Sequence, residues 1–412
     1  MTSVHKNIFW LMLIQVSGYI FPLLMLPYLV RVFSPEGFGI YSIIIAVVQY
    51  AVLIVDFGFG FTAMRKISLS REIKKEVSKI FLSTIYAKLT IFLVLVFITF
   101  GGVYSAREHM YFNYVLAGSL TVLFNILFPI WYFQAVENVR TISIVTAISR
   151  ACVFILIITM IKTPHDITLA IYINSLLYLF PAVFSLAYIL KNKIITYQKI
   201  TTTQVWNDTC EAFPLFISNM STSLYTTLNT LILGKYTNNS IVGNYAAAER
   251  LRSAVQGLFL PVQQAVFPRA SRLLTSPDGV KKVITIYGIP FVVVGIIAGL
   301  SFYFFGNLFI SIYYGNGYEL SGHLIKIMAP LLPLVALAMV VVNWILIALG
   351  ENKLVGKIYF LYSILHLCYV FPLVKLYSAA GMVYSVMLTE SLITLTMMYF
   401  VYKNTQYPRE AK

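Results

Sequence analysis

Long apolar runs, separated by short polar segments, recur along almost the whole chain. A window of about 19 residues finds about twelve of them. Each is about 20 residues or longer, which is the length a helix needs to cross the hydrocarbon core of a bilayer. Their approximate ranges are 8–30, 38–62, 80–104, 111–134, 141–161, 167–190, 210–234, 241–268, 283–308, 323–349, 354–374 and 379–402. Because the runs lack the alternation of barrel strands, they predict an all-α integral membrane protein with about twelve transmembrane helices.

Composition excludes a soluble globular protein. Of the 412 residues, 59% are hydrophobic and only 11% are charged, and the mean hydropathy is +0.82. A soluble core of this size needs less apolar surface and more charge around it. The first run has no small-residue cleavage site after it, so we expect it to be retained as a helix. The three cysteines are scattered and predict no disulfide framework.

The Lys and Arg residues are distributed unequally between the two sides of the predicted membrane. If the N-terminus is cytoplasmic, 20 of the 30 fall on cytoplasmic segments and six on outer loops. This bias follows the positive-inside rule, so both termini are predicted to be cytoplasmic. The net charge of +15 is then mostly a topology signal toward the anionic inner leaflet. We expect no nucleic-acid partner, because no soluble basic domain is present to bind one.

The two halves of the sequence echo each other. At a constant offset of 204 positions, three pairs match: Arg31 with Lys235, Gly39 with Gly243, and Tyr41 with Tyr245. The segments 133–140 and 347–353 also share a Glu-Asn pair. These echoes predict two six-helix bundles in the same orientation, residues 1–200 and 201–412, around a central cavity. Two such halves that rock around a cavity are a transporter design.

The stretch AAAERLRSAVQG (246–257) carries charge into a run that otherwise reads as membrane-buried. A charge that faced lipid would cost about 2.5–3.5 kcal/mol. At about 100° per residue, one polar seam forms along a single helix face. The seam comprises Tyr245, Glu249, Arg252, Gln256 and Gln263. Arg250 lies about 100° off it. We therefore expect the seam to face inward and to line a cavity.

Other predicted helices also carry polar side chains, with Asp56 near a cytoplasmic end. Among them are Asp56, Lys88, Arg150, Asn219, Asn229, His366 and Glu390. A structural role competes with a functional one for several of these. Lys88 can reach an interface or pair with a carboxylate, and polar faces can serve helix–helix contacts. We expect His366 to be a hydrogen-bonded packing residue rather than a proton relay.

No motif of a soluble catalytic centre is present. The nearest imitation of a phosphate-binding loop, GENKLVGKI (350–358), has five residues between its glycines and no Ser or Thr after Lys357. The His and Cys residues lack zinc-ligand spacing, and no polar segment reaches the size of a domain. We expect a protein that is not an enzyme and has no metal site or cofactor.

Three segments resemble the O-antigen flippases of the polysaccharide transporter family, in the multidrug/oligosaccharidyl-lipid/polysaccharide exporter superfamily. They are DFGFGFTAMRKIS (56–68), FQAVENVRTISIVTAISR (133–150) and AAAERLRSAVQGLFLPVQQAVFPRASRL (246–273). The resemblance runs from the first apolar run through the eleventh. One departure is that Met64 and Lys66 stand where a small polar and an acidic residue are common, and we assign no role to either.

This resemblance implies a multi-pass protein of the bacterial inner membrane. Its expected activity is to move polyprenyl-diphosphate-linked O-antigen units from the cytoplasmic to the periplasmic face by alternating access. Coupling to a gradient of protons or Na⁺ is also expected. The expected partners are the lipid-linked oligosaccharide, membrane lipid, an O-antigen polymerase and a chain-length regulator.

A binding site for such a cargo requires cations near the diphosphate, and amides, hydroxyls and aromatic rings near the sugars. The candidates for the diphosphate are Arg252, Arg150, Lys88, Arg31 as an outer gate, and Arg250. The candidates for charge balance or ion coupling are Glu249, Glu390 and Asp56. The candidates for glycan contact are Gln256, Gln263, Asn219, Asn229 and Tyr245.

Two other functions compete with this one. A drug–cation antiporter of the same superfamily would need acidic residues for cationic cargo. At membrane depth, however, four Lys or Arg residues stand against Glu249 and Glu390, which favours anionic cargo. The second competitor is a non-transporting membrane component of a glycan assembly complex. The polar seams argue against it, because a scaffold has no use for buried polarity.

Overall fold

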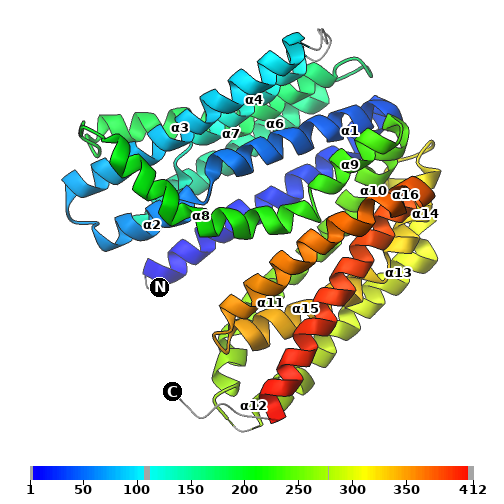
Figure 1. Cartoon of the computed structure of the whole chain (residues 1–412). Helices are drawn as coiled ribbons and strands as arrows, with labels where there is room; N and C mark the ends of the chain where they lie inside the picture. Colours follow the sequence, from blue (N-terminus) through cyan, green and yellow to red (C-terminus); the bar gives the residue numbers. More distant parts are fainter. Residues whose placement is uncertain (1–2, 106–111, 277, 407–412) are drawn as a thin grey trace. The chain divides into compact units, whose positions relative to one another are not determined.

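A computed structural model describes residues 3–105, 112–276 and 278–406 of the chain (Figure 1). The described residues form helices and loops and contain no strand. They divide into two compact units. The first unit comprises residues 1–33 and 43–220, and the second comprises residues 34–42 and 221–412. The ends of the chain, whose cytoplasmic placement is predicted, lie outside the described ranges, as does Arg107, one of the six cations predicted to lie on outer loops.

The helices of the first unit begin with α1 (Ser3–Asp56), except for its residues 34–42, which belong to the second unit. Helix α1 is broken at Ser34 (φ 60°, ψ 170°). Ser34 precedes Pro35, and the residue before a proline is pushed out of the α conformation. The others are α2 (Phe59–Leu69), α3 (Lys74–Ser105), α4 (Phe112–Leu127), α5 (Ile130–Ala135), α6 (Val139–Met160), α7 (Ile167–Lys191) and most of α8 (Thr202–Leu224). Both α4 and α6 pack along α7, as Figure 1 shows.

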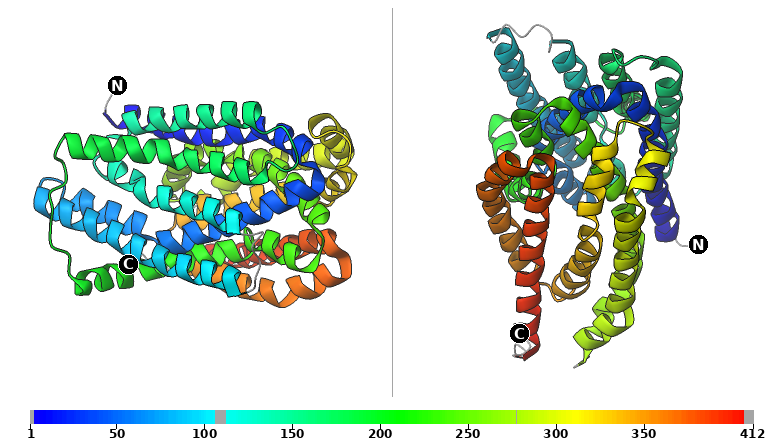
Figure 2. Two further views of the ribbon diagram at one scale, coloured as in Figure 1. Left: turned by 90° about the horizontal axis from the view of Figure 1, so that it is seen from above. Right: turned by 90° about the vertical axis from the view of Figure 1, so that its right-hand side faces the viewer.

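The second unit is built around two long helices. They are α13 (Ile289–Tyr313) and α16 (Asn352–Gln406), and the latter is broken at Ser378 (φ 54°, ψ −132°). The shorter helices are α9 (Leu228–Tyr236), α10 (Asn239–Gly257), α11 (Phe259–Leu273), α12 (Gly279–Val283), α14 (Glu319–Met328) and α15 (Leu331–Met339). Two π-helical segments, η2 (Ile284–Gly288) and η3 (Val340–Ile347), continue α12 and α15. Figure 2 shows these helices from two further sides.

Helix α13 carries small residues on its buried face and large apolar residues on its exposed face, as membrane helices do. Three of its six buried residues are glycines, and a Cβ at Gly295 would come within 2.8 Å of the Ala336 side chain of α15. Its opposite face exposes large apolar residues, among them Ile297 (58%) and Phe304 (66%). Small residues at a helix contact and large apolar residues outside are the arrangement that lipid favours.

The predicted fold class is confirmed, while the number of membrane crossings stays a prediction. Among the described helices, seven are long and apolar enough to cross a membrane, or eight if the pair α14 and α15–η3, bent by 41°, is one span. Four of the twelve predicted runs lie in α1 and α16, because each of these helices continues through its break. The runs 210–234 and 241–268 lie on the pairs α8–α9 and α10–α11, which carry much of the polarity discussed below.

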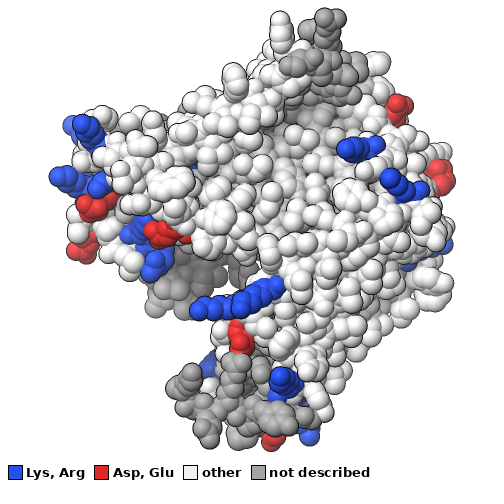
Figure 3. All heavy atoms as spheres, in the orientation of Figure 1, with Lys and Arg blue, Asp and Glu red and all other residues white. Residues whose placement is uncertain are grey.

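On the face shown in Figure 3, many of the charged side chains gather toward the two sides of the view, and a broad surface between them is largely uncharged. This distribution fits a protein whose middle is embedded in lipid.

The compact units do not coincide with the predicted halves 1–200 and 201–412, since residues 34–42 and 201–220 are divided differently.

Candidate functional site

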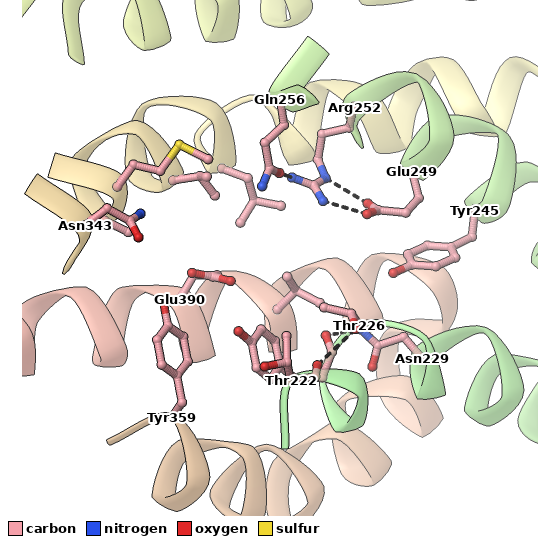
Figure 4. A pocket seen from close by; sticks show the side chains of 16 residues that line it. Thr222, Thr226, Asn229, Tyr245, Glu249, Arg252, Gln256, Asn343, Tyr359 and Glu390 are labelled. Atoms are coloured by element: carbon pink, nitrogen blue, oxygen red, sulfur yellow. Dashed lines mark hydrogen bonds and ion pairs between the residues drawn. The ribbon is translucent and has the colours of Figure 1, made fainter. Parts of the chain in front are cut away.

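A cavity of about 260 Å³ lies within the second unit (Figure 4). Its walls come from α10 on one side and from α8, α9, α15, η3 and α16 around it. The lining residues are Thr222, Tyr225, Thr226, Asn229, Tyr245, Glu249, Arg252, Gln256, Leu331, Val335, Ala338, Met339, Asn343, Tyr359, Val386 and Glu390. We call this space the second-unit cavity. Four of the five residues of the predicted seam line it.

Arg252 is the central charged group of this cavity. Its Nε donates to Glu249 Oε2 at 2.8 Å and its Nη2 donates to Glu249 Oε1 at 2.6 Å. Its Nη1 donates to Gln256 Oε1 at 2.5 Å. These partners stand three and four residues away, so a single stretch of α10 holds the guanidinium on both edges. Arg252 is only 9% exposed, and pairing in a fork is what makes a buried guanidinium tolerable.

Glu390 of α16 lies across the cavity from Arg252 and Glu249 (Figure 4). Its carboxylate has no hydrogen bond or ion pair to any residue in the described ranges. Arg252, Glu249 and Glu390 together give the cavity a formal charge of −1 when all three are ionised. Polar groups without charge complete the wall, including Asn343 of η3 and Tyr359 of α16.

Asn229 connects the cavity to a buried hydrogen-bonded cluster around His366. Its Nδ2 donates to the Tyr225 carbonyl at 2.8 Å, so its Oδ1 is free to accept from His366 Nε2 at 3.1 Å. His366 Nδ1 lies 2.7 Å from Thr389 Oγ1, which also contacts the Tyr369 hydroxyl at 2.6 Å. His366 is fully buried. Its partners are those expected of a hydrogen-bonded packing residue.

A second polar cavity, of about 250 Å³, lies within the first unit. It is lined by Ile14, Asp56, Lys88, Asn125, Phe128, Ile130, Trp131, Thr146, Arg150, Leu177 and Tyr178. Lys88 Nζ pairs with Asp56 Oδ1 at 2.6 Å. Arg150 Nη1 donates to Ser17 Oγ at 2.6 Å and to the Ile14 carbonyl. We call this space the first-unit cavity, and its formal charge is +1.

The structure places the remaining candidates outside both cavities. Arg250 lies over the rings of Phe38 and Tyr41, with its Cζ 5.2 Å and 5.7 Å from their centroids. Arg31 and Asn219 are exposed. Gln263 follows the break between α10 and α11 at Leu258, which changes the helix phase. The angular spacing that groups Tyr245 to Gln256 therefore does not extend to Gln263.

Sequence reasoning missed several polar residues of these sites. Asn343 and Tyr225 line the second-unit cavity, and Asn125 and Trp131 line the first-unit cavity. A lone amide in an otherwise apolar run, such as Asn343 or Asn125, was a usable signal. Lys66 was also missed. Its Nζ pairs with Asp208 at 2.7 Å and with Glu211 at 2.6 Å, which fixes α2 to α8.

The match to known families is decided by sequence. Residues 4–274 match the family described as polysaccharide biosynthesis protein. The chain belongs to this family. Two relatives share the name "Putative O-antigen transporter". One, from Shigella dysenteriae, is 33% identical over 395 residues, which are 96% of this chain and 99% of the relative. The other, from Escherichia coli K12, is 30% identical over 408 residues, covering 98% and 97%.

Solved structures extend the family likeness to the fold. An inward-facing multidrug resistance MATE family transporter of the MOP superfamily matches with a TM-score of 0.70, at 10% identity, over 94% of each chain. The lipid II flippase MurJ in an inward closed conformation matches with a TM-score of 0.69, at 15% identity, over 95% of this chain and 87% of that one. This polysaccharide biosynthesis family member is thus a multi-pass membrane protein with a transporter fold.

The second-unit cavity has the lining of a site for a polar solute. Within the described ranges, no group of three or more His, Cys, Asp or Glu residues comes together as metal ligands do. What the cavity offers is one oriented guanidinium, one unpartnered carboxylate and several amides and hydroxyls. Such a lining can bind and orient a polar solute through hydrogen bonds.

Proposed function

We propose that this protein is a flippase that moves polyprenyl-diphosphate-linked O-antigen units from the cytoplasmic to the periplasmic face of the bacterial inner membrane. The observation that carries the proposal is the second-unit cavity, a polar space enclosed by helices of a membrane protein. The names of the relatives and the MurJ-like fold support the same activity. A polar cavity in a membrane fold supports a polar cargo, because buried polarity is costly to keep there.

The second-unit cavity suits the glycan part of this cargo. The charge of Arg252 is neutralised by Glu249, and its side chain is held by Gln256. Its remaining N–H groups can therefore donate hydrogen bonds to a neutral sugar and do not select for an anion. Asn229, Tyr245 and Asn343 add amides and a phenol. Its volume of about 260 Å³ is just under the range of roughly 300–1,000 Å³ typical of drug-sized ligands. A single sugar unit is a fitting occupant.

Glu390 suits the coupling step. A carboxylate that has no ionic partner can take up a proton or a monovalent cation when its side of the membrane becomes accessible. Loading and release at Glu390 would then bias the protein between two accessible states, which is the requirement for coupled alternating access. The predicted orientation, with both termini in the cytoplasm, and partnership with a polymerase and a chain-length regulator belong to the same proposal.

The deciding experiment uses a bacterium in which the gene is deleted. We expect lipid-linked O-units to accumulate on the cytoplasmic face, where they are protected from a periplasmic labelling reagent, and surface O-antigen to be lost. The plasmid-borne gene should restore both. A cation antiporter, which the carboxylates of the cavity would also serve, predicts drug sensitivity with normal surface O-antigen instead. Normal export with no drug phenotype would leave a non-transporting role.

A further inference from the structure

The first-unit cavity contains more hydrogen-bond donors and more positive charge than its own residues satisfy. We propose that it is a binding site for a phosphate group, held by Arg150, Lys88 and the indole N–H of Trp131. The inference deepens the proposed function, because the cargo of such a flippase carries a diphosphate. It rests on contacts within the first unit alone.

Arg150 is the main source of positive charge. Only its Nη1 is engaged, by the Ile14 carbonyl and Ser17 Oγ. Its Nε and Nη2 have no hydrogen-bond partner in the described part of the chain. Gly18 leaves room for the group, since a Cβ there would lie 3.2 Å from Nη1. A guanidinium has five N–H donors, so α1 fixes one edge and leaves the other available for an anion.

Lys88 brings a second cation together with its counter-ion. Lys88 is 3% exposed, and its Nζ is paired with Asp56 Oδ1 at 2.6 Å. The pair is neutral, and an ammonium has two more N–H donors to offer. The net positive charge of the cavity therefore belongs to Arg150, and no carboxylate pairs with that residue in the described ranges. Arg150 is half-buried, and a partly desolvated cation without a counter-ion attracts an anion.

Trp131 supplies an independent sign of a missing acceptor. It lines the cavity, it is 4% exposed, and its buried Nε1 has no hydrogen-bond partner. Buried indole N–H groups usually find a partner. Since this N–H can only donate, the ligand that satisfies it must present an acceptor.

The donor set selects the class of ligand. Guanidinium, ammonium and indole groups all donate, and they come from α6, α3 and α5. A metal cation would meet Asp56 as the one carboxylate of the lining, and Asp56 is already paired with Lys88. A phosphate group has acceptor oxygens on several sides and matches donors that arrive from several directions. About 250 Å³ also gives room for more than a halide ion.

The test measures binding to the full-length protein, purified in phosphatidylcholine nanodiscs, with inorganic pyrophosphate and inorganic phosphate as probes. Titration calorimetry should detect binding to the wild type. Arg150→Gln should weaken binding about tenfold to hundredfold, because hydrogen bonds to charged groups are the stronger ones. Trp131→Phe keeps the ring, loses only the N–H and should weaken binding about two- to tenfold. Arg140→Gln, an exposed position on the same helix as Arg150, should bind as the wild type does.

Three outcomes would overturn the proposal: no binding to the wild type, equal binding by Arg150→Gln and Arg140→Gln, or binding unaffected by Trp131→Phe. Thermal unfolding identifies any variant that fails to fold, and Arg150→Lys, which keeps the charge, should then retain part of the affinity. Competition by a polyprenyl diphosphate would identify the cargo as the source of the phosphate group. Competition by phosphatidylglycerol nanodiscs alone would identify a lipid headgroup. Absence of binding with O-antigen export intact would reject this site and leave the proposed flippase activity standing.

Discussion

Gly39 and Gly243 lie against each other within the second unit, and their contact is reciprocal. A Cβ on Gly39 would overlap the carbonyl oxygen of Asn239, and a Cβ on Gly243 would overlap the carbonyl oxygen of Pro35. Pro35 and Asn239 are themselves 204 positions apart, as are the two glycines. The two partners in the contact therefore stand at the same offset of 204 positions on which the predicted repeat is based.

We expect Gly39→Ala and Gly243→Ala to destabilise the protein by about 1–3 kcal/mol each, the usual cost of overpacking. Both methyl groups would meet backbone atoms, which cannot rotate away. The measurement is the thermal unfolding temperature of the purified protein. Gly356→Ala is the matched control, because nothing lies within 4 Å of a Cβ there. If the unfolding temperatures of all three variants equalled that of the wild type, the close contact between Gly39 and Gly243 would be contradicted.

The helical membrane class was predictable because it depends on local hydropathy alone. The positions where helices break were not. Ser34 and Ser378 interrupt α1 and α16 without ending them, and a hydropathy window does not detect such a change in direction. The break at Leu258 likewise separates Gln263 from a seam that angular spacing extends to it.

Contacts between residues distant in the sequence could not be predicted either, because local sequence patterns carry no information on tertiary packing. Helical spacing shows that Glu249, Arg252 and Gln256 share a face, because all three belong to one helix. It carries no information on Lys66 and Asp208, which are 142 positions apart and meet only through tertiary packing. The resemblance to the family led us to assign no role to Lys66, although it joins α2 to α8.

Lys66 provides a test of that contact. Lys66→Glu should destabilise the protein by about 1–3 kcal/mol, because it replaces a charge-assisted contact with repulsion from Asp208 and Glu211. Lys66→Glu combined with Asp208→Lys should recover part of the loss in a thermal unfolding measurement. If the loss of stability in the double variant equalled the sum of the losses in the two single variants, the ion pairs would contribute nothing to stability. Ser83 also donates to Asp208, at 2.5 Å, so full recovery is not expected.

Arg250 is expected to stabilise the protein without contacting cargo. Its guanidinium stacks on Phe38 and Tyr41, and a cation over an aromatic ring contributes about 0.5–2 kcal/mol. Arg250→Ala should lower the unfolding temperature accordingly. Export of O-antigen, normalised to the amount of folded protein, should stay near the wild-type level. A complete loss of export with unchanged stability would instead place Arg250 in the transport path.

Arg252 is expected to be needed for transport. Arg252→Ala removes the group that orients Glu249 and Gln256, so surface O-antigen should be lost while the protein still reaches the membrane. Arg252→Lys should restore little, since an ammonium does not reproduce the fork that spans both partners. Immunoblotting of membranes and of surface O-antigen measures both quantities. Arg269→Ala, an exposed position on α11, should behave as the wild type, and normal export by Arg252→Ala would remove the assigned role.

Glu390 separates coupling from cargo binding. Glu390→Gln keeps the size and polarity of the side chain and removes its ability to hold a proton or a cation. Because Glu390 makes no ion pair in the described ranges, the substitution should not lower the unfolding temperature. Export should fall, and the remainder should no longer respond when an uncoupler collapses the gradient. Glu319→Gln, which changes an exposed carboxylate of the same unit, should keep the full response.

Glu390 stands opposite the Arg252–Glu249 pair. Coupling is assigned to this carboxylate if the Glu390→Gln protein binds cargo normally but transports it slowly. An unchanged response to the uncoupler would assign coupling elsewhere.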